Sequence, residues 1–395
     1  MSDLWWPGDE RAGDLLSDAT LLAAMVEVEQ AWLDALAEAG TAPRADLSRA
    51  VAPEDVVRIA EGAEETGNPV VGLVKVLRER SGNTWVHRGL TSQDVLDSAV
   101  MLCLRAAAGK LTQDQSRQAL ALAGLAETHR GSLMPGRTLT QSAVPITFGL
   151  KAAVWLGGVL DAAERVSALR FPAQFGGAAG TLSAATAIAG SPAAARALCA
   201  DAASRLGLDD TMPWHTSRGP VTTIADALVA ATDSAGRIAG DVVTLARPEI
   251  GELREPAGRG GSSTMPHKAN PVLSILIRRT AMTAPQLGAT LHLAASLADD
   301  ERPDGAWHAE WASLRDLGRR TVVAASQTAE LLEGLVVDTD AMRTHAATAW
   351  AELTAERDVI AAFAAGSGSD DDYLGATDIL IDSALDRAHT FLEQS

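Results

Sequence analysis

Two apolar stripes with heptad spacing constrain the fold of this chain more than any other feature. In residues 224–245, small and branched apolar side chains recur at alternating intervals of four and three residues, and residues 314–335 repeat the pattern. Such spacing is typical of long α-helices that pack at shallow angles. Two further apolar segments, 148–169 and 273–297, also have helical length. Four long helices predict an all-α fold built on a helical bundle.

Composition supports helices and excludes several classes of partner. Aromatic residues make up only 4% of the 395 residues, which favours helices over sheets. The formal net charge is −18, so neither nucleic acid nor an anionic membrane surface is an expected partner. No stretch approaches the roughly 20 apolar residues of a membrane span, and the first residues do not resemble a signal peptide. We therefore expect a cytoplasmic protein.

Cysteine usage also favours a cytoplasmic protein. Cys103 and Cys199 are the only cysteines. Two isolated cysteines provide neither a disulfide framework nor a cluster of metal ligands, which fits a reducing compartment. We predict no metal and no organic cofactor.

Changes in helix length divide the chain into three predicted domains. Residues 1–105 are predicted to form an N-terminal domain of shorter helices, and residues 106–340 a central domain of long helices. Residues 341–395 are predicted to form a short C-terminal helical domain. Within it, a run of glycine, serine and aspartate at 366–372 predicts a solvated loop.

Residues 258–271 carry the strongest chemical signal, with the sequence Gly-Arg-Gly-Gly-Ser-Ser-Thr-Met-Pro-His-Lys-Ala-Asn-Pro. The glycines allow a ligand to approach the backbone closely, and the prolines keep the segment out of a helix. The hydroxyls, Lys268 and Asn270 suit a carboxylate and the extra negative charge that it gains when the neighbouring carbon loses a proton. A flexible linker is the simpler alternative, but linkers do not usually carry a Met-Pro-His-Lys-Ala-Asn-Pro tail.

Two other segments have a functional and a structural interpretation. The sequence His-Arg-Gly-Leu-Thr-Ser-Gln-Asp at 87–94 precedes an apolar helix, which Thr91 or Ser92 would cap, with Asp94 in the first turn. A helix N-terminus with two hydroxyls also suits a carboxylate. Residues 137–149 contain a glutamine ahead of a proline, and a buried glutamine satisfied by backbone is the simpler interpretation there.

Together, these three segments resemble the signature regions of the fumarase/aspartase superfamily. Residues 258–271 resemble Gly-Ser-Ser-x-Met-Pro-x-Lys-x-Asn-Pro, and residues 87–94 resemble His-x-Gly-x-Thr-Ser-x-Asp. Residues 137–149 resemble Arg-Thr-x-x-Gln-x-Ala-x-Pro-x-Thr-Phe-Gly. The resemblance implies an all-α long helical bundle, assembled as a homotetramer with a central twenty-helix core. Each active site would join regions from three subunits.

Three more segments narrow the resemblance to the 3-carboxy-cis,cis-muconate cycloisomerases of the protocatechuate pathway. They are Gln-Phe-Gly-Gly-Ala-Ala-Gly-Thr at 174–181, Pro-Trp-His-Thr-Ser-Arg at 213–218, and Glu-Arg at 301–302 followed by Gly-Ala-Trp-His-Ala-Glu-Trp at 305–311. The implied reaction is the lactonisation of a muconate triacid, by proton transfer next to a carboxylate through an aci-carboxylate intermediate. No cofactor is implied.

The resemblance also implies roles for individual residues. Ser262 would be the general base or proton donor, Lys268 would stabilise its alkoxide and the intermediate, and Glu310 would orient a histidine or a water. Arg218 would be a second clamp for a carboxylate. The small polycarboxylate substrate would be bound by His87, Thr91, Ser92, Thr138, Gln141, His215, Arg218, Ser263, Met265 and Asn270.

Departures from the family pattern leave the substrate open. Leu139 and Ser142 stand where many members have a histidine, so the usual imidazole acid is missing. Ala269 replaces a common arginine, which predicts one substrate carboxylate fewer. The chain after about residue 345 is also shorter than the family's C-terminal domain.

A good leaving group makes the missing acid unnecessary. A carboxylate that leaves a lactone has a parent pKa of roughly 4 and departs without protonation, and the same holds for nitrite. Two alternatives to the cycloisomerase therefore remain. One is a related lyase that eliminates a stable anion from a substituted succinate, and the other is a weakly active paralogue.

Overall fold

The computed structural model describes residues 3–265, 268–361, 363 and 373–394, and helices dominate these ranges, as predicted. The predicted loop at 366–372 lies outside them. After a short 3-10 helix, Asp9–Ala12, the helices are α1 (Asp18–Glu38), α2 (Asp55–Thr66), α3 (Val70–Ser81), α4 (Ser92–Thr128), α5 (Phe148–Ser167), α6 (Ser183–Ala189), α7 (Pro192–Leu206), α8 (Gly219–Leu245), α9 (Val272–Ser296), α10 (Gly305–Glu333), α11 (Thr339–Thr348), α12 (Trp350–Leu353), α13 (Ala355–Ala361) and α14 (Thr377–Gln394). Two antiparallel strand pairs accompany them, β1 (Leu133–Thr138) with β2 (Gln141–Thr147) and β3 (Leu253–Arg254) with β4 (Val336–Val337).

The four predicted long helices are present. Helices α8 and α10 cover the two heptad stripes, and α5 and α9 cover the other apolar segments. Stripe residues such as Leu228, Ile238, Leu317 and Leu331 are buried, as expected for the packed face of a helix.

Helix α4 begins where the predicted cap places it but crosses a predicted domain boundary. It begins at Ser92 and has 37 residues, so the predicted domain boundary at residue 105 falls inside it. The division into three domains stays a prediction.

The described contacts group the chain into two compact units, each assembled from three segments. Unit 1 consists of Met1–Gly109, Ala168–Asp226 and Gln286–Arg320. Unit 2 consists of Lys110–Ser167, Ala227–Pro285 and Thr321–Ser395.

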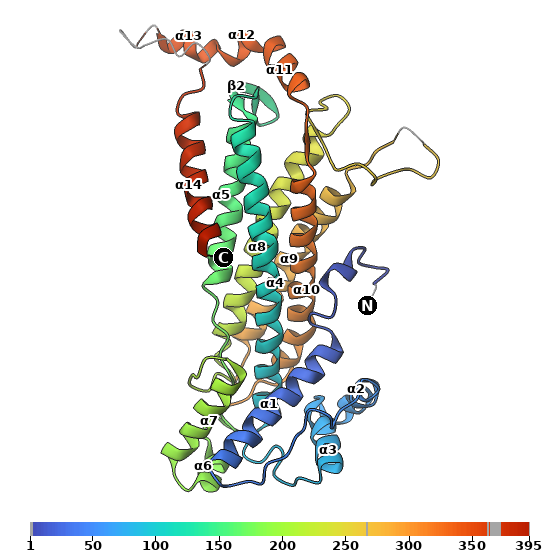
Figure 1. The fold of residues 1–395 in the computed structure, drawn as a ribbon, viewed down its shortest axis with the longest axis vertical. Coiled ribbons are helices and arrows are strands. Elements are labelled where there is room, and N and C mark those ends of the chain that lie inside the picture. The colour runs from blue at the N-terminus through green and yellow to red at the C-terminus, as the bar shows by residue number, and fades with distance from the viewer. Residues whose placement is uncertain (1–2, 266–267, 362, 364–372, 395) are drawn as a thin grey trace. The chain divides into compact units, whose positions relative to one another are not determined.

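In unit 1, α1 packs against α7, which in turn contacts α6 (Figure 1). The hydroxyl of Ser17 caps α1 by accepting a hydrogen bond from the backbone N–H of Thr20 at 3.1 Å. One face of α1 is deeply buried, and its Trp32 ring stacks on Phe175 with centroids 5.7 Å apart. Helix α1 therefore forms part of the core beside the glycine-rich segment at 174–181.

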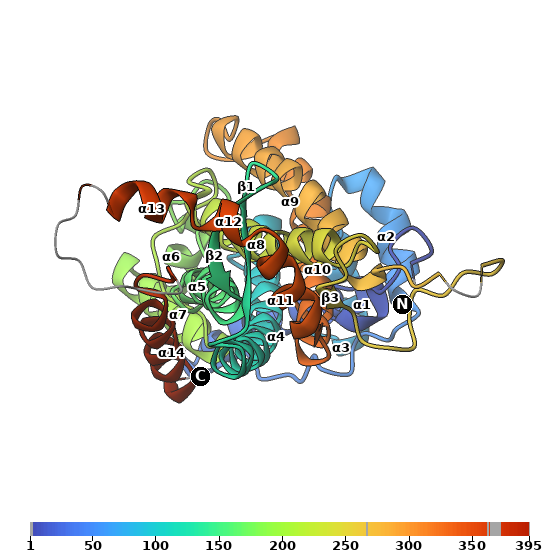
Figure 2. The same cartoon turned by 90° about the horizontal axis from the view of Figure 1, so that it is seen from above.

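In unit 2, a core of large apolar side chains joins α5, α8 and α10. Phe148 and Trp155 of α5 pack edge to face in the same cluster as Val242 of α8 and Leu331 of α10. Helix α14 packs along α5, and α11 and α12 contact β1 and β2 (Figure 2). The C-terminal helices thus lie on the elements that carry the second signature region.

None of the described helices is long and apolar enough to cross a bilayer.

Candidate active site

The signature loop at 258–271, drawn in gold in Figure 1, is closed at its base by Gly260 and Asn270. The carbonyl of Gly260 accepts hydrogen bonds from the backbone N–H and the side-chain Nδ2 of Asn270, both at 2.9 Å. Gly260 has φ +73°, and a Cβ there would lie 2.0 Å from the carbonyl oxygen of Asn270. Only glycine fits this position. The amide of Asn270, expected on the substrate, instead binds the backbone of the loop.

The residues beyond this base are largely exposed. Ser262 is half-buried, and its Oγ accepts hydrogen bonds from the backbone N–H groups of Thr264 at 3.4 Å and Met265 at 3.2 Å. Ser263, Met265 and Lys268 are exposed. Within the described ranges, the Lys268 ammonium has no carboxylate partner, so its charge is available to an anionic ligand. Pro266 and His267 of the motif lie outside the described residues.

Two carboxylates anchor the ends of the loop. Glu255 accepts hydrogen bonds from the backbone N–H groups of Leu273 at 3.0 Å and Ser274 at 2.7 Å, which caps α9. Arg259 forms an ion pair of 2.6 Å with Glu330 on α10. The base of the loop is thereby fixed on both sides.

The second signature region forms a β-hairpin, where the sequence predicted only a segment that precedes a helix. Prolines at 135 and 145, which helices exclude, face each other in its register. Thr138 pairs with Gln141 across a two-residue tip, where Leu139 has φ +48° and Thr140 φ +76°. Thr138 and Gln141 are exposed, and Gln141 Nε2 donates only to Thr140 Oγ1, at 3.2 Å. The interpretation of Gln141 as a buried, backbone-satisfied glutamine is therefore wrong.

An ion pair that the sequence did not suggest holds the hairpin. Arg137 donates to both carboxylate oxygens of Glu252, at 2.9 and 2.6 Å. Glu252 is fully buried, and His345 of α11 lies 2.8 Å from the same carboxylate through Nδ1. The three residues are far apart in sequence, so local patterns gave no signal. Among the described residues, no hydrogen bond or ion pair joins the hairpin to the loop at 258–271.

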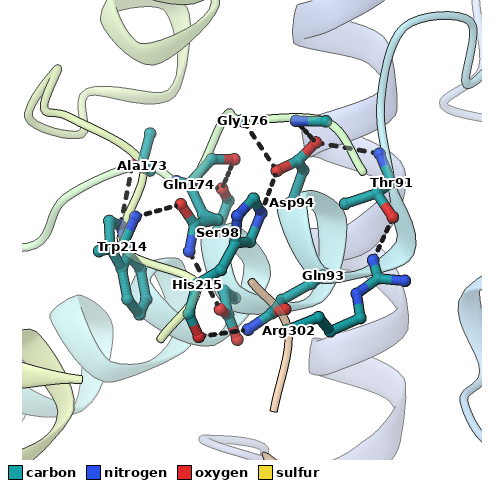
Figure 3. A network of polar contacts seen from close by, with 12 residues as sticks. Thr91, Gln93, Asp94, Ser98, Ala173, Gln174, Gly176, Trp214, His215 and Arg302 are labelled. Carbon is teal, nitrogen blue, oxygen red and sulfur yellow. Dashed lines mark hydrogen bonds and ion pairs between the residues drawn. The ribbon is translucent and has the colours of Figure 1, made fainter. Parts of the chain in front are cut away.

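The first signature region is organised around the buried carboxylate of Asp94 (Figure 3). Its Oδ1 accepts from Gly176 N–H at 2.9 Å and lies 3.0 Å from His215 Nε2. Its Oδ2 accepts from the backbone N–H groups of Thr91 at 2.9 Å and Gly177 at 3.0 Å. The glycine-rich segment thus binds a carboxylate of the chain itself. His215, expected to bind substrate, is buried with its Nε2 on Asp94.

Thr91, not Ser92, stands at the cap of α4, because Ser92 is already its first residue. The Asp94 carboxylate accepts a hydrogen bond from the backbone N–H of Thr91, as the acidic residue three positions after the cap does in a capping box. The Thr91 hydroxyl accepts a hydrogen bond from the exposed guanidinium of Arg302. Sequence reasoning did not assign Arg302 to the site, and the Glu-Arg dipeptide at 301–302 was the available signal. Arg302 places a cation beside Thr91 and the N-terminus of α4.

Arg218 and Glu310 belong to a buried charge cluster. Arg218 donates through Nε and Nη2 to both oxygens of Glu310, at 3.0 and 2.6 Å, and through Nη1 to Asp97 at 2.7 Å. All three residues are buried, and Trp307 Nε1 also donates to Asp97. Instead of clamping a substrate carboxylate, Arg218 clamps two carboxylates of the chain. Glu310, expected to orient a histidine or a water, is bound to Arg218.

The environment shifts the pKa values of this cluster. Burial disfavours the charge of Arg218, but Asp97 and Glu310 outweigh that effect and hold the pKa of its guanidinium above the ordinary value. Burial raises the pKa of Glu310, and its bonds to Arg218 oppose the shift. Burial is the larger effect, so the pKa of Glu310 stays raised despite its ion pair, and the charge of Asp97 adds to the shift.

His87 lies before Thr91 with 18% of its side chain exposed, and its Nδ1 is 2.6 Å from Glu29 Oε1. The two cysteines are buried, and burial raises the pKa of each thiol, Cys103 and Cys199, to about 12. Over the described ranges, no group of three or more His, Cys, Asp or Glu side chains is arranged to hold a metal ion.

Comparison with known proteins places these features in a family. Residues 15–285 match the model of the lyase family, described as Lyase. The chain is 46% identical over 360 residues to a nitrosuccinate lyase of Streptomyces davaonensis, an alignment that covers 87% of this chain and 76% of the relative. It is 40% identical over 345 residues to the 3-carboxy-cis,cis-muconate cycloisomerase of Bradyrhizobium diazoefficiens, covering 83% and 75% of the two chains.

A solved structure has the same fold along nearly the whole chain. The 3-carboxy-cis,cis-muconate lactonizing enzyme of Pseudomonas putida superposes with a TM-score of 0.87 at 30% identity. The superposition covers 96% of this chain and 97% of that one.

Proposed function

Because this chain belongs to the lyase family of the fumarase/aspartase superfamily, we propose that it eliminates a stable anion from a substituted succinate, with nitrosuccinate as substrate. The products would be fumarate and nitrite. The 46% identity to a nitrosuccinate lyase supports this substrate, and the chemistry of the site residues supports the type of reaction.

The reaction requires one proton transfer and one bond cleavage. A base removes a proton from C3 of nitrosuccinate, and the electron pair is delocalised into the neighbouring C4 carboxylate as an aci-carboxylate. The pair then forms the C2–C3 double bond while the C2–N bond breaks and nitrite departs with its electrons. One dianion gives fumarate, nitrite and a proton, so atoms and charge balance.

Ser262 is the proposed base, and Lys268 is its proposed electrostatic partner. A serine hydroxyl is a weak base that needs a nearby positive charge to favour its alkoxide. Lys268 supplies that charge from the same loop, and its ammonium has no carboxylate partner in the described part of the chain. Thr91, Ser92, Thr138, Gln141, Ser263 and Met265 are the proposed substrate contacts, and Arg302 joins them as a carboxylate-binding residue.

The observation that carries the proposal is the absence of an imidazole from the hairpin tip. Leu139 is 96% exposed at that tip, and Ser142 follows Gln141 on the same exposed edge. Neither side chain is a useful acid at neutral pH, so the leaving group must depart as a stable anion. Nitrite meets this condition, whereas hydroxide and amines do not. Ala269 also leaves the loop with one cation fewer, which favours a dicarboxylate over a triacid.

A second candidate is the 3-carboxy-cis,cis-muconate cycloisomerase reaction. The 40% identity to one such enzyme and the TM-score of 0.87 to another favour it. A substrate carboxylate would add across a double bond, and Ser262 would deliver the proton to the carbon next to another carboxylate. No acid is needed for the carboxylate, so the composition of the hairpin fits this reaction as well.

We further propose a homotetramer in which three subunits share each site. Two features support shared sites: the exposed hairpin tip with Leu139, and the lack of polar contacts between the described parts of the hairpin and the loop at 258–271. An exposed leucine beside Thr138 and Gln141 would be covered once another subunit contributes its loop.

The experiment compares both substrates with the same enzyme preparation. Wild type is expected to release nitrite and fumarate from nitrosuccinate faster than it consumes the diene of 3-carboxy-cis,cis-muconate. Ser262→Ala should lower kcat by a factor of at least about a thousand while the melting temperature is unchanged. Ser48→Ala, at an exposed serine outside the site, is the control. Faster consumption of the diene would favour the cycloisomerase, and full activity of Ser262→Ala would exclude the serine as base.

A further inference from the structure

Glu29 is a buried carboxylate with one hydrogen-bond partner. It lies on α1 with no exposed surface, and its Oε1 is 2.6 Å from Nδ1 of His87. Its second oxygen, Oε2, is buried and has no hydrogen-bond partner. Removing a carboxylate from water is costly unless a proton or a cation compensates its charge. His87 is the group placed to do so.

The net charge of the Glu29–His87 pair determines whether Nε2, the second ring nitrogen of His87, carries a hydrogen. An uncharged pair exists either as a carboxylate with a doubly protonated imidazole or as a carboxylic acid that donates to Nδ1 of a neutral imidazole. In both forms the remaining nitrogen, Nε2, carries a hydrogen. In such an uncharged pair, His87 presents an N–H donor on the side away from Glu29, and 18% of its side chain is exposed to solvent.

Helix α1 also fixes the backbone that carries His87. Trp32, one turn after Glu29, donates from its indole to the carbonyl of Arg88 at 2.7 Å. Gly89 has φ +95°, and a Cβ there would lie 3.1 Å from the Trp32 ring. His87 itself has a backbone φ of +65°, which residues other than glycine rarely adopt. Such a conformation persists because several surrounding contacts determine it.

We propose that Glu29 is a positioning residue, which orients His87 so that its Nε2–H donates a hydrogen bond to a carboxylate of the substrate. This inference rests on the proposed function, because it takes the substrate to be a small dicarboxylate. A purely structural role explains the burial of Glu29 poorly. An apolar side chain of similar volume fills such a position without the cost of a buried carboxylate.

Fumarate, the expected product, serves as the probe, and its affinity is measured by calorimetry with full-length protein. Glu29→Met and His87→Asn are each expected to weaken fumarate binding by about tenfold, as for loss of a hydrogen bond to a charged group. The double variant should bind no more weakly than His87→Asn, because Glu29 acts through His87. Glu27→Met, on the exposed side of the same helix, is the matched control and should bind as wild type.

Conservative substitution separates positioning from packing. The amide of Glu29→Gln donates to Nδ1 and keeps the hydrogen on Nε2, so it should recover part of the affinity that Glu29→Met loses. Melting temperatures confirm that each variant is folded. Additive losses in the double variant, or equal affinities of the Met and Gln variants, would overturn the inference.

Turnover of nitrosuccinate is measured in parallel and separates the two proposals. A wild type that binds fumarate with the expected coupling but does not release nitrite would refute the reaction and leave the role of Glu29 intact. Turnover of nitrosuccinate together with additive losses of fumarate affinity would support the reaction and refute the role of Glu29. A wild type that does not bind fumarate would overturn the inference.

Discussion

At the scale of single residues, Arg218 forms ion pairs with two buried carboxylates. Its guanidinium is shared between Asp97 and Glu310, and all three side chains are buried. Removal of one partner of a buried ion pair leaves a charge without compensation, which is far more destabilising than loss of a surface pair.

Arg218→Met is therefore expected to lower the free energy of unfolding by about 3–5 kcal/mol, measured by urea denaturation. Arg205→Met is the control, because Arg205 forms a surface pair with Asp201 on the same helix and should cost about 1 kcal/mol or less. Equal losses of unfolding free energy in the two variants would contradict the prediction that the buried ion pairs of Arg218 matter more to stability than a surface pair.

The raised pKa of Glu310 predicts how stability depends on pH. The folded state holds the Glu310 proton more tightly than the unfolded chain, whose carboxyl has an ordinary pKa of 4.5. Stability contributed by this group is thus present below pH 4.5 and is lost as the pH rises through the raised value. Between about pH 4 and about pH 7, wild type should lose stability relative to Glu310→Gln, measured by urea unfolding at each pH. A constant difference between the two proteins would contradict this prediction.

At the scale of elements, the base of the signature loop depends on one glycine. Gly260→Ala places a Cβ against the carbonyl of Asn270 at a backbone angle that alanine disfavours. The substitution should reduce kcat by at least about tenfold and accelerate tryptic cleavage after Arg259 or Lys268, while the melting temperature changes little. Gly261→Ala is the matched control, since a Cβ at the next residue meets no atom within 4 Å.

Elements with a strong local signal could be predicted from sequence, and elements defined by distant partners could not. The stripes ending at Leu245 and Leu335 predicted α8 and α10 because helical periodicity is a local property. The hairpin at 133–147 was missed, although Pro135 and Pro145 exclude a helix there. Its strands are recognised only once they pair, and the Arg137–Glu252 contact that holds them joins residues far apart in sequence.

In the candidate site, too, contacts between residues distant in sequence could not be predicted. Sequence motifs identified the three segments, and the loop at 258–271 and the exposed Thr138 and Gln141 remain candidates for substrate contact. The motifs did not distinguish side chains that face a ligand from those that hold the segments in place. His215 and Arg218 proved to have partners inside the fold, and those partners, Asp94 and Asp97, lie on α4, far away in sequence.

At the scale of the whole molecule, the proposed sharing of active sites between subunits predicts that two inactive variants restore each other. Gln141→Ala and Ser262→Ala disable different segments, so a mixed tetramer contains sites with both segments intact. Random mixing should recover about a quarter of wild-type activity, because each segment has about one chance in two of being native. Co-expression followed by an assay of nitrosuccinate turnover measures this recovery.

A second pair of variants provides the control. Ser262→Ala and Lys268→Ala lie in the same loop, so no site in their mixture receives an intact loop, and no activity should return. Recovery in this control, or none in the first mixture, would contradict shared sites.

The exposed hairpin tip has a consequence for how this enzyme diverged from its relatives. Leu139 and Ser142 are exposed and are absent from the apolar core that stabilises unit 2. Substitutions at exposed positions of this kind usually change folding stability by less than about 0.5 kcal/mol. The side chain at this tip could therefore change without compensating mutations in the core of the same chain.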